Sequence, residues 1–269
     1  MNSELIDSFF KYIVEIAAHL SQYNESKPNQ MFLDHLVYIN KYDNMTYTFI
    51  NSLVTNDRYK PIIHVFLDSL IYLHSDTSIA EEELLKNDSQ FNRRTYIRCF
   101  FSEVEGILFT LQKMTVELLE QDSGVGEQTI LINKNFMKSK YGRKADKTSI
   151  SYYEILPQQF LALQEADYKV EETGEVILSP KFISPKNKVA FVEKMLNTVF
   201  GTNLNIKSIS GWEDFTNSIE IRNDITHPKN LHCFQIDDDE LKKINNARLW
   251  FDKFITQTLK EIIIAINTF

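Results

Sequence analysis

Glycine and proline are scarce in this chain, with only seven and six among its 269 residues. Sheets and tight turns use both types heavily, because glycine supplies positive φ angles and proline fixes φ within turns. Their shortage therefore favours long helices joined by few loops. Apolar residues make up 43% of the chain, which is enough to build a hydrophobic core. The length allows one large domain or two small ones.

Apolar residues recur at helical spacing in the first third of the chain. This spacing predicts helices over residues 4–20 and 28–39 and a third helix over 61–74. Residues 75–77 are Ser-Asp-Thr, which is typical of a helix N-cap, so we expect a break there followed by a short acidic helix. Together these helices form an N-terminal helical section, residues 1–88.

The remaining residues, 89–269, begin with the longest helical pattern of the chain, over 88–121. A basic, irregular insertion follows at about 122–150, and then a further helical pattern over 151–167. Alternating residues on both sides of a Thr-Gly pair predict a small β-hairpin at 169–178.

Three more helices complete the predicted fold. One covers residues 185–200 and ends at Gly201, which suits a helix C-terminus. A short helix over 212–226 ends before Pro228, and an acidic turn at residues 237–240 starts a last helix that reaches residue 269. The sequence therefore predicts an all-α protein with one small hairpin.

The charge and the cysteine content restrict the kinds of partner. The formal net charge is −8, so contact with RNA or DNA requires a local basic patch. Cys99 and Cys233 are the only cysteines, which favours a reducing compartment over a disulfide framework. The first residues lack the basic stretch of a secretory signal, and no window of 18 uncharged apolar residues occurs. We therefore expect a cytoplasmic protein with no membrane partner.

One short segment contains residue types that carry out chemistry on phosphates. Arg222 and Asn223 are followed by His227, directly before Pro228. Because proline disfavours helical geometry in the preceding residue, His227 is expected at the end of the helix, where its ring could turn back towards Arg222. An arginine fork matches a phosphate, and a histidine exchanges protons near neutral pH. Such a pair could activate the 2′-hydroxyl of RNA for strand cleavage without a metal, with Asn223 orienting the phosphate or the ribose.

The spacing alone is a weak signal, because short patterns also match by chance. In the simpler interpretation, Arg222 is a surface residue paired with Glu220 or Asp224, and His227 only caps the helix. The neighbouring asparagine, the helix before the segment and Pro228 after it favour the functional interpretation.

Two segments resemble the HEPN superfamily (higher eukaryotes and prokaryotes nucleotide-binding). Residues 222–228 read Arg-Asn-Asp-Ile-Thr-His-Pro, which is similar to the superfamily pattern of arginine, a polar residue and then histidine after four to six residues. Residues 92–106 resemble the long first helix of bacterial HEPN proteins, with Arg98 and Glu105 two turns apart on one face. The order of the helices also agrees, and the resemblance covers residues 89–269.

The resemblance implies a helical bundle that dimerises through its Arg-His segments. Active HEPN proteins are metal-independent endoribonucleases of toxin–antitoxin and anti-phage systems, so Arg222, Asn223 and His227 would carry the activity. Glu105 would hold either Arg98 or Arg222. An ion pair between Arg98 and Glu105 that only fixes helix packing is the other explanation for these two residues. Many HEPN proteins have no demonstrated nuclease activity, which leaves a binding function open.

A basic run in the insertion could guide a nucleic acid towards this segment. Its central cations are Lys138, Lys140, Arg143 and Lys144. They could bind the phosphate backbone while Tyr141 stacks on a base. The simpler interpretation is a solvated loop.

No metal site or cofactor motif is predicted. The other histidines lack a cysteine or carboxylate at ligand spacing; they are His19, His35, His64, His74 and His232. Phosphate-binding glycine loops and nucleophile elbows do not occur in the sequence. The 19 phenylalanines and 12 tyrosines are expected in the core and in a dimer interface.

The leading hypothesis is a homodimeric, metal-independent endoribonuclease that acts in phage defence or as a toxin. Its partners would be an RNA substrate and an antitoxin or another defence protein. The second hypothesis is a non-catalytic HEPN module that binds nucleotides, RNA or protein, with the N-terminal section docking the partner. In the third, the chain is purely structural and the Arg-His segment has no function.

Overall fold

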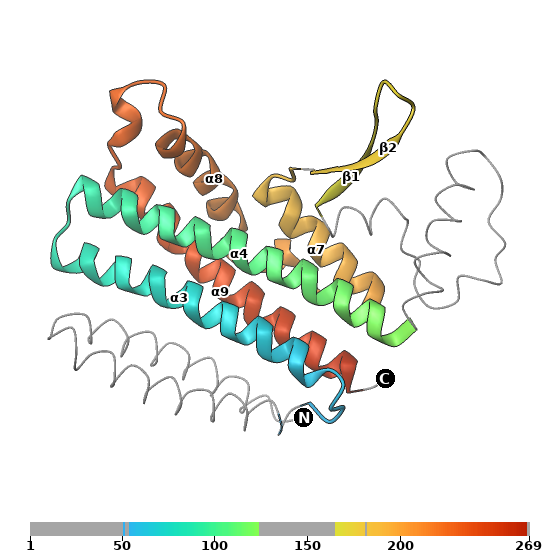
Figure 1. The fold of residues 1–269 in the computed structure, drawn as a ribbon. Coiled ribbons are helices and arrows are strands. Elements are labelled where there is room, and N and C mark those ends of the chain that lie inside the picture. Colours follow the sequence, from blue (N-terminus) through green and yellow to red (C-terminus); the bar gives the residue numbers. More distant parts are fainter. Residues whose placement is uncertain (1–50, 52–53, 124–164, 181, 268–269) are drawn as a thin grey trace, which may run out of the picture. The chain divides into compact units, whose positions relative to one another are not determined.

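The computed structural model describes residues 51, 54–123, 165–180 and 182–267 (Figure 1). This described part is mostly helical and contains a single two-stranded sheet, so the expectation of an all-α chain with one hairpin is confirmed for it. None of the described helices combines the length and the apolar character that a membrane crossing requires. Several predicted segments lie outside the described residues, namely 4–20, 28–39, almost all of 122–150, and 151–164.

The first described helix, α3, runs without interruption over Lys60–Lys86. The predicted break at residues 75–77 is therefore wrong. The Thr77 hydroxyl donates to the carbonyl oxygen of Leu73 at 3.3 Å, one helical turn back, and Ser75 and Thr77 are buried. A hydroxyl bonded in this way fits inside a helix, and the only proline of α3 lies in its first turn, where it is tolerated.

The next helix, α4, covers Gln90–Ser123 and confirms the long helix predicted for residues 88–121. It passes through both compact units of the chain. The first unit includes α4 up to Ile107 and continues from Asn205 to the C-terminus, and the second unit is Leu108–Leu204. The residues of α3 therefore belong to the same unit as the Arg222–His227 segment.

In the first unit, α3, the first half of α4 and α9 are long helices that lie side by side, and α8 is shorter (Figure 1). The short helix η3 precedes α8, and η4 joins α8 to α9. The bounds are Ile206–Ser208 for η3, Trp212–Thr226 for α8, Leu231–Phe234 for η4 and Asp238–Ile266 for α9. The predicted short helix before Pro228 is thus confirmed.

The core between α8 and α9 is built on Trp250, which is fully buried. Its ring stacks on Phe215 of α8 with 4.4 Å between ring centroids and on Phe254 at 5.6 Å. Its indole N–H donates to the carbonyl oxygen of Ile206 in η3 at 3.2 Å. One side chain therefore fixes both the position of α8 on α9 and the segment that leads into α8.

The start of α9 follows the sequence-based expectation. Asp237 is the N-cap residue, and its carboxylate accepts the backbone N–H of Glu240 at 2.7 Å. The Glu240 carboxylate accepts the backbone N–H of Asp237 in return, which completes a capping box. Acidic residues in this first turn also stabilise the positive end of the helix dipole.

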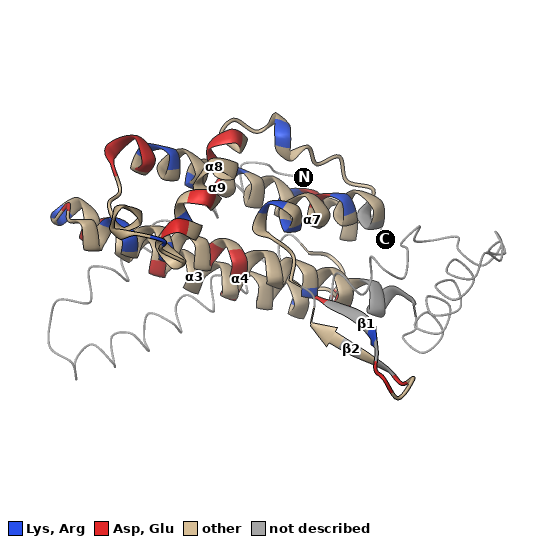
Figure 2. Ribbon diagram, turned by 90° about the horizontal axis from the view of Figure 1, so that it is seen from above, with Lys and Arg blue, Asp and Glu red and all other residues tan. Residues whose placement is uncertain are grey.

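The second unit contains the hairpin and α7. Strands β1 (Ala166–Val170) and β2 (Val176–Pro180) pair antiparallel, and Figure 2 shows acidic residues at the turn between them. Helix α7 covers Pro185–Phe200, and Gly201 follows it with φ of 62°. The predicted hairpin and the predicted helix with its C-terminal glycine are therefore both confirmed.

Replacement of Gly211 by alanine tests the packing at the start of α8. Gly211 has φ of 107°, and an added Cβ would lie 2.8 Å from Cβ of Trp250 and 2.9 Å from the backbone oxygen of Asn246. Backbone strain and overpacking together should lower the free energy of unfolding by about 2–4 kcal/mol. Urea denaturation of the full chain measures this loss.

The matched control is Gly201→Ala, which is also at positive φ but would place its Cβ in open space. We expect a loss of about 1 kcal/mol from this variant, because only the left-handed backbone opposes the new side chain. Equal losses in the two variants would contradict the close approach of Gly211 and Trp250.

Candidate functional site

The Arg222–His227 segment lies at the C-terminal end of α8. His227 is the C-cap residue of this helix, with φ of −126°, and its backbone N–H donates to the carbonyl oxygen of Asn223 at 2.8 Å. Pro228 follows directly and cannot continue the helix. The expected position of His227 at the helix end is therefore confirmed, and this position also fits the capping role of the simpler interpretation.

Arg222 connects α8 to α4. Its guanidinium donates through Nη2 to a carboxylate oxygen of Glu105 and through Nη1 to the side-chain oxygen of Asn223 at 3.1 Å. The Arg222 side chain is 21% exposed and that of Glu105 is 39% exposed, so the pair is half-buried. Of the two partners considered for Glu105 from the sequence, the structure brings Arg222 to it.

The other expected ion pairs are not found among the described residues. Arg98 is exposed and makes no ion pair there, although it shares the long helix with Glu105. Glu220 and Asp224 are also exposed and do not pair with Arg222. The proposed packing role for an Arg98–Glu105 pair is therefore not supported, and neither is a local pair on α8.

The polar groups around the helix end face solvent. Asn223, Asp224 and His227 are all exposed, and exposed residues continue through the following loop to His232. No hydrogen bond joins the His227 ring to Arg222 in the described part of the chain. The structure thus places Arg222, Asn223 and His227 at one exposed helix end. Glu105 orients Arg222, and Arg222 does not hold the ring of His227.

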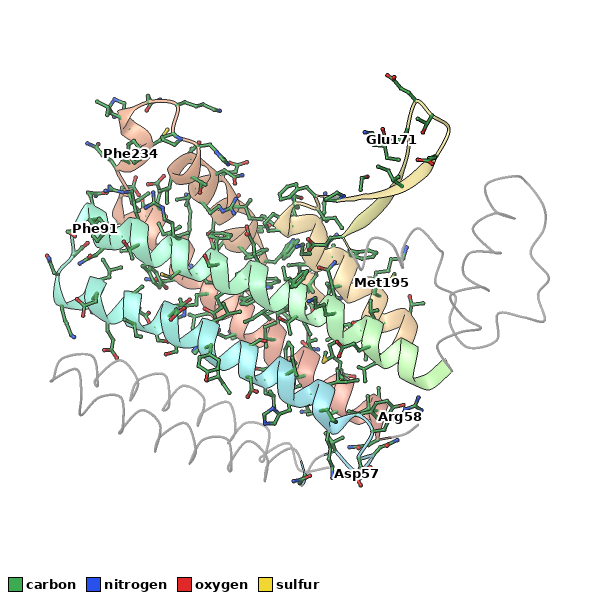
Figure 3. The ribbon with its side chains drawn as sticks, in the orientation of Figure 1. Asp57, Arg58, Phe91, Glu171, Met195 and Phe234 are labelled. Carbon is green, nitrogen blue, oxygen red and sulfur yellow. The ribbon has the colours of Figure 1, made fainter. Side chains whose placement is uncertain are left out.

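The loop after this segment is fastened to the start of α4. The guanidinium of Arg94 donates to the carbonyl oxygen of Phe234 at 2.6 Å, and that of Arg93 donates to the carbonyl oxygen of Ile236 at 2.8 Å. Figure 3 shows Phe234 at the same end of the unit as Phe91, in the first turn of α4. Both sides of the candidate site are therefore anchored on α4, through Glu105 before the loop and through these arginines after it.

The basic run of the insertion does not contribute to the described site. Lys138, Lys140, Arg143 and Lys144 all lie outside the described residues. Their predicted role in RNA binding stays a prediction.

A buried group of charged side chains that sequence reasoning did not predict lies between α3, α4 and α9. His74 is 7% exposed and Glu103 is 1% exposed, and Nδ1 of His74 lies 2.8 Å from Oε1 of Glu103. Asp252 approaches both from α9. We refer to these three residues as the buried cluster. No spacing pattern predicts it, because its members come from three helices far apart in the sequence.

The protonation behaviour of the buried cluster reflects its charge. Burial raises the pKa of Asp252 to about 6, with the charge of Glu103 adding to the effect. Burial alone would lower the pKa of His74, but the hydrogen bond to Glu103 and its negative charge outweigh this and raise it. His74 and Asp252 therefore hold their protons more tightly than they would in water.

Arg248 lies beside the buried cluster and has a carboxylate partner of its own. It is 8% exposed, and its guanidinium pairs with Glu81 and donates to the hydroxyl of Ser78 at 3.0 Å. Its positive charge is thus largely matched by Glu81.

The comparisons with known proteins do not assign a family. No protein-family model, curated protein or solved structure matches this chain.

Replacing Glu105 by glutamine tests whether the ion pair with Arg222 serves mainly to orient the arginine. Because the pair is half-exposed, we expect Glu105→Gln to lower the free energy of unfolding by less than about 1 kcal/mol. The matched control is Asp224→Asn, which should change stability by less than about 0.5 kcal/mol. Urea denaturation measures both, and a loss above about 2 kcal/mol for Glu105→Gln would show that the pair instead holds α8 in place.

Proposed function

We propose that this chain is a metal-independent endoribonuclease of HEPN type that acts as a homodimer in phage defence or as a toxin. The main support is the exposed helix end that presents Arg222, Asn223 and His227 together, with the arginine oriented by Glu105. A second support is the order of the elements from α4 onwards, in which the long helix α4 comes before the short helix α8 with the Arg-His segment, and the long helix α9 follows.

In the proposed reaction, the guanidinium of Arg222 binds the scissile phosphate of RNA. The imidazole of His227 takes the proton of the 2′-hydroxyl, and the 2′-oxygen attacks the phosphorus. The bond from phosphorus to the 5′-oxygen breaks, and that oxygen takes a proton from the second histidine of the dimer or from water. The products are a 2′,3′-cyclic phosphate and a 5′-hydroxyl end.

The ion pair with Glu105 leaves Arg222 able to bind a phosphate. Arginine carries five N–H donors, and the described residues accept hydrogen bonds from two of its nitrogens, Nη1 and Nη2. The remaining donors can contact a phosphate while Glu105 keeps the fork in one orientation. Asn223, which accepts from Nη1, supplies an amide that can donate to a phosphate or a ribose oxygen.

Two observations favour the alternative function, a non-catalytic module that binds a nucleotide, RNA or a protein. The carboxylate of Glu105 offsets the positive charge of Arg222 and competes with a substrate phosphate for it. The His227 ring is also not hydrogen-bonded to Arg222 in the described residues. A binding role requires neither an oriented histidine ring nor an arginine that is free of a carboxylate partner.

The experiment that tests catalysis compares variants induced in growing cells, with total RNA separated on a gel. We expect the wild type to arrest growth and to fragment RNA, and we expect Arg222→Ala and His227→Ala to lose at least about 100-fold of the cleavage rate. His232→Ala is the matched control, because His232 is an exposed histidine outside the proposed site and should leave cleavage unchanged.

Soluble expression of all variants must be equal for this comparison. Intact RNA and normal growth with the wild type would favour the binding module over the nuclease. Equal cleavage by wild type and His227→Ala would remove His227 from the mechanism.

Metal independence is tested separately with purified protein. Cleavage should persist in excess EDTA while circular dichroism shows that the chain stays helical, and the new ends should carry 2′,3′-cyclic phosphates. Loss of cleavage in EDTA with the helical signal intact would contradict the mechanism, because the proposed site uses only Arg222, Asn223 and His227.

A further inference from the structure

The buried cluster of His74, Glu103 and Asp252 brings together three side chains that are each a common metal ligand. One ligand atom from each lies within 4.8 Å of the other two. Two ligands of a tetrahedral ion with bonds near 2.1 Å are roughly 3.4 Å apart, so side-chain shifts of about 1 Å would place all three around one ion. The three residues come from α3, α4 and α9, within one compact unit.

An unsatisfied oxygen provides a second observation at the same place. Oε2 of Glu103 is buried and has no hydrogen-bond partner among the described residues, although Oε1 of the same carboxylate pairs with His74. Glu103 is 1% exposed, so bulk water does not reach it readily. A buried carboxylate oxygen without a partner costs free energy, which a bound cation would remove.

The charges around the buried cluster also favour the binding of a cation. Arg248 is the one described arginine beside it, and that guanidinium is already paired with Glu81. Glu103 and Asp252 are therefore two carboxylates in the interior, and the cations that face them are His74 when it is protonated and Arg248, which Glu81 shares. A divalent cation would balance both charges and leave His74 neutral, as metal ligation requires.

We propose that His74, Glu103 and Asp252 bind one divalent transition-metal cation, such as Zn²⁺ or Mn²⁺, that joins α3, α4 and α9. One imidazole nitrogen with two carboxylates is a mixed donor set that suits these ions better than Ca²⁺ or Mg²⁺, which prefer oxygen ligands alone. Asp252 is the member of the buried cluster that is partly exposed. The inference is independent of the proposed function, because Arg222 and His227 take no part in the site.

The test uses the full chain, freed of metal with EDTA and then dialysed. Calorimetric titration with ZnCl₂ and, separately, with MnCl₂ should show one ion bound per chain for at least one of the two metals. A metal concentration about 100 times the Kd should raise the unfolding temperature by roughly 5–10 °C.

The variants Glu103→Gln and Asp252→Asn should each lower the affinity for the metal at least about 100-fold, because each removes a charged ligand. The matched control is Glu105→Gln, the same substitution two residues further along α4, which should leave metal binding unchanged. The second control, His227→Ala, excludes binding at the exposed histidine of the candidate ribonuclease site. If Glu103→Gln fails to fold, the Asp252→Asn variant, at a partly exposed position, provides the test.

Two results would overturn the proposal. One is the absence of binding of both metals to the folded wild type. The other is binding that persists with unchanged affinity in folded Glu103→Gln or Asp252→Asn. In either case the buried cluster is a proton-binding network that holds the helices together without a metal. Cleavage of RNA is not measured here, so a failure of this proposal and a failure of the proposed function are distinguishable.

Discussion

The burial of Trp250 is the constraint on which the position of the candidate site depends. Its ring occupies the space between α9 and α8, and its indole N–H satisfies a carbonyl oxygen of η3. The close approach requires glycine at position 211, directly before α8. Arg222 follows eleven residues later, about three helical turns, so the packing that starts α8 also sets where its functional end lies. Loss of a buried tryptophan typically lowers the free energy of unfolding by about 3–5 kcal/mol, so the packing of Trp250 holds α8 firmly on α9.

Helix α4 connects the interior of the first unit to the candidate site. Glu103 and Glu105 are two residues apart, which turns their side chains by about 200° around the helix. One carboxylate accordingly belongs to the buried cluster, and the other is half-exposed and holds Arg222. Because the interior is densely packed, a change in the buried cluster that rotated or shifted α4 would also displace Glu105. The buried cluster and the partner of Arg222 therefore lie on the same helix, on faces that point in nearly opposite directions.

The sequence predicted those parts of the fold that depend on local chemistry. Gly201, Pro228 and the acidic turn at Asp237 each end or start a helix by their own backbone preferences, and the structure agrees at all three. The prediction failed at residues 75–77, where serine and threonine hydroxyls can cap a new helix or bond back within an existing one. Burial decided between these two options, and burial depends on tertiary packing that a local pattern does not contain.

The distinction between local patterns and tertiary contacts also applies to the candidate site. Arg222, Asn223 and His227 lie within six residues, so a local pattern could identify them. The contact from Arg222 to Glu105 joins residues 117 apart in the sequence, and the sequence also left Arg98 open as a partner of Glu105. Glu103 lies 29 residues after His74, and Asp252 comes from a third helix, so no spacing rule could bring these three together.

The charge of the chain limits how the proposed site could work. A net charge of −8 repels RNA at long range, and Glu105 offsets the one arginine at the centre of the site. Arg222 can therefore orient a phosphate that has already arrived, but it cannot by itself attract a nucleic acid. Under the proposed function, other cations must bring RNA to the site, and the basic run at residues 134–147 is one source in the sequence. Under the proposed function, those cations rather than the Arg222–His227 segment would supply most of the affinity for RNA.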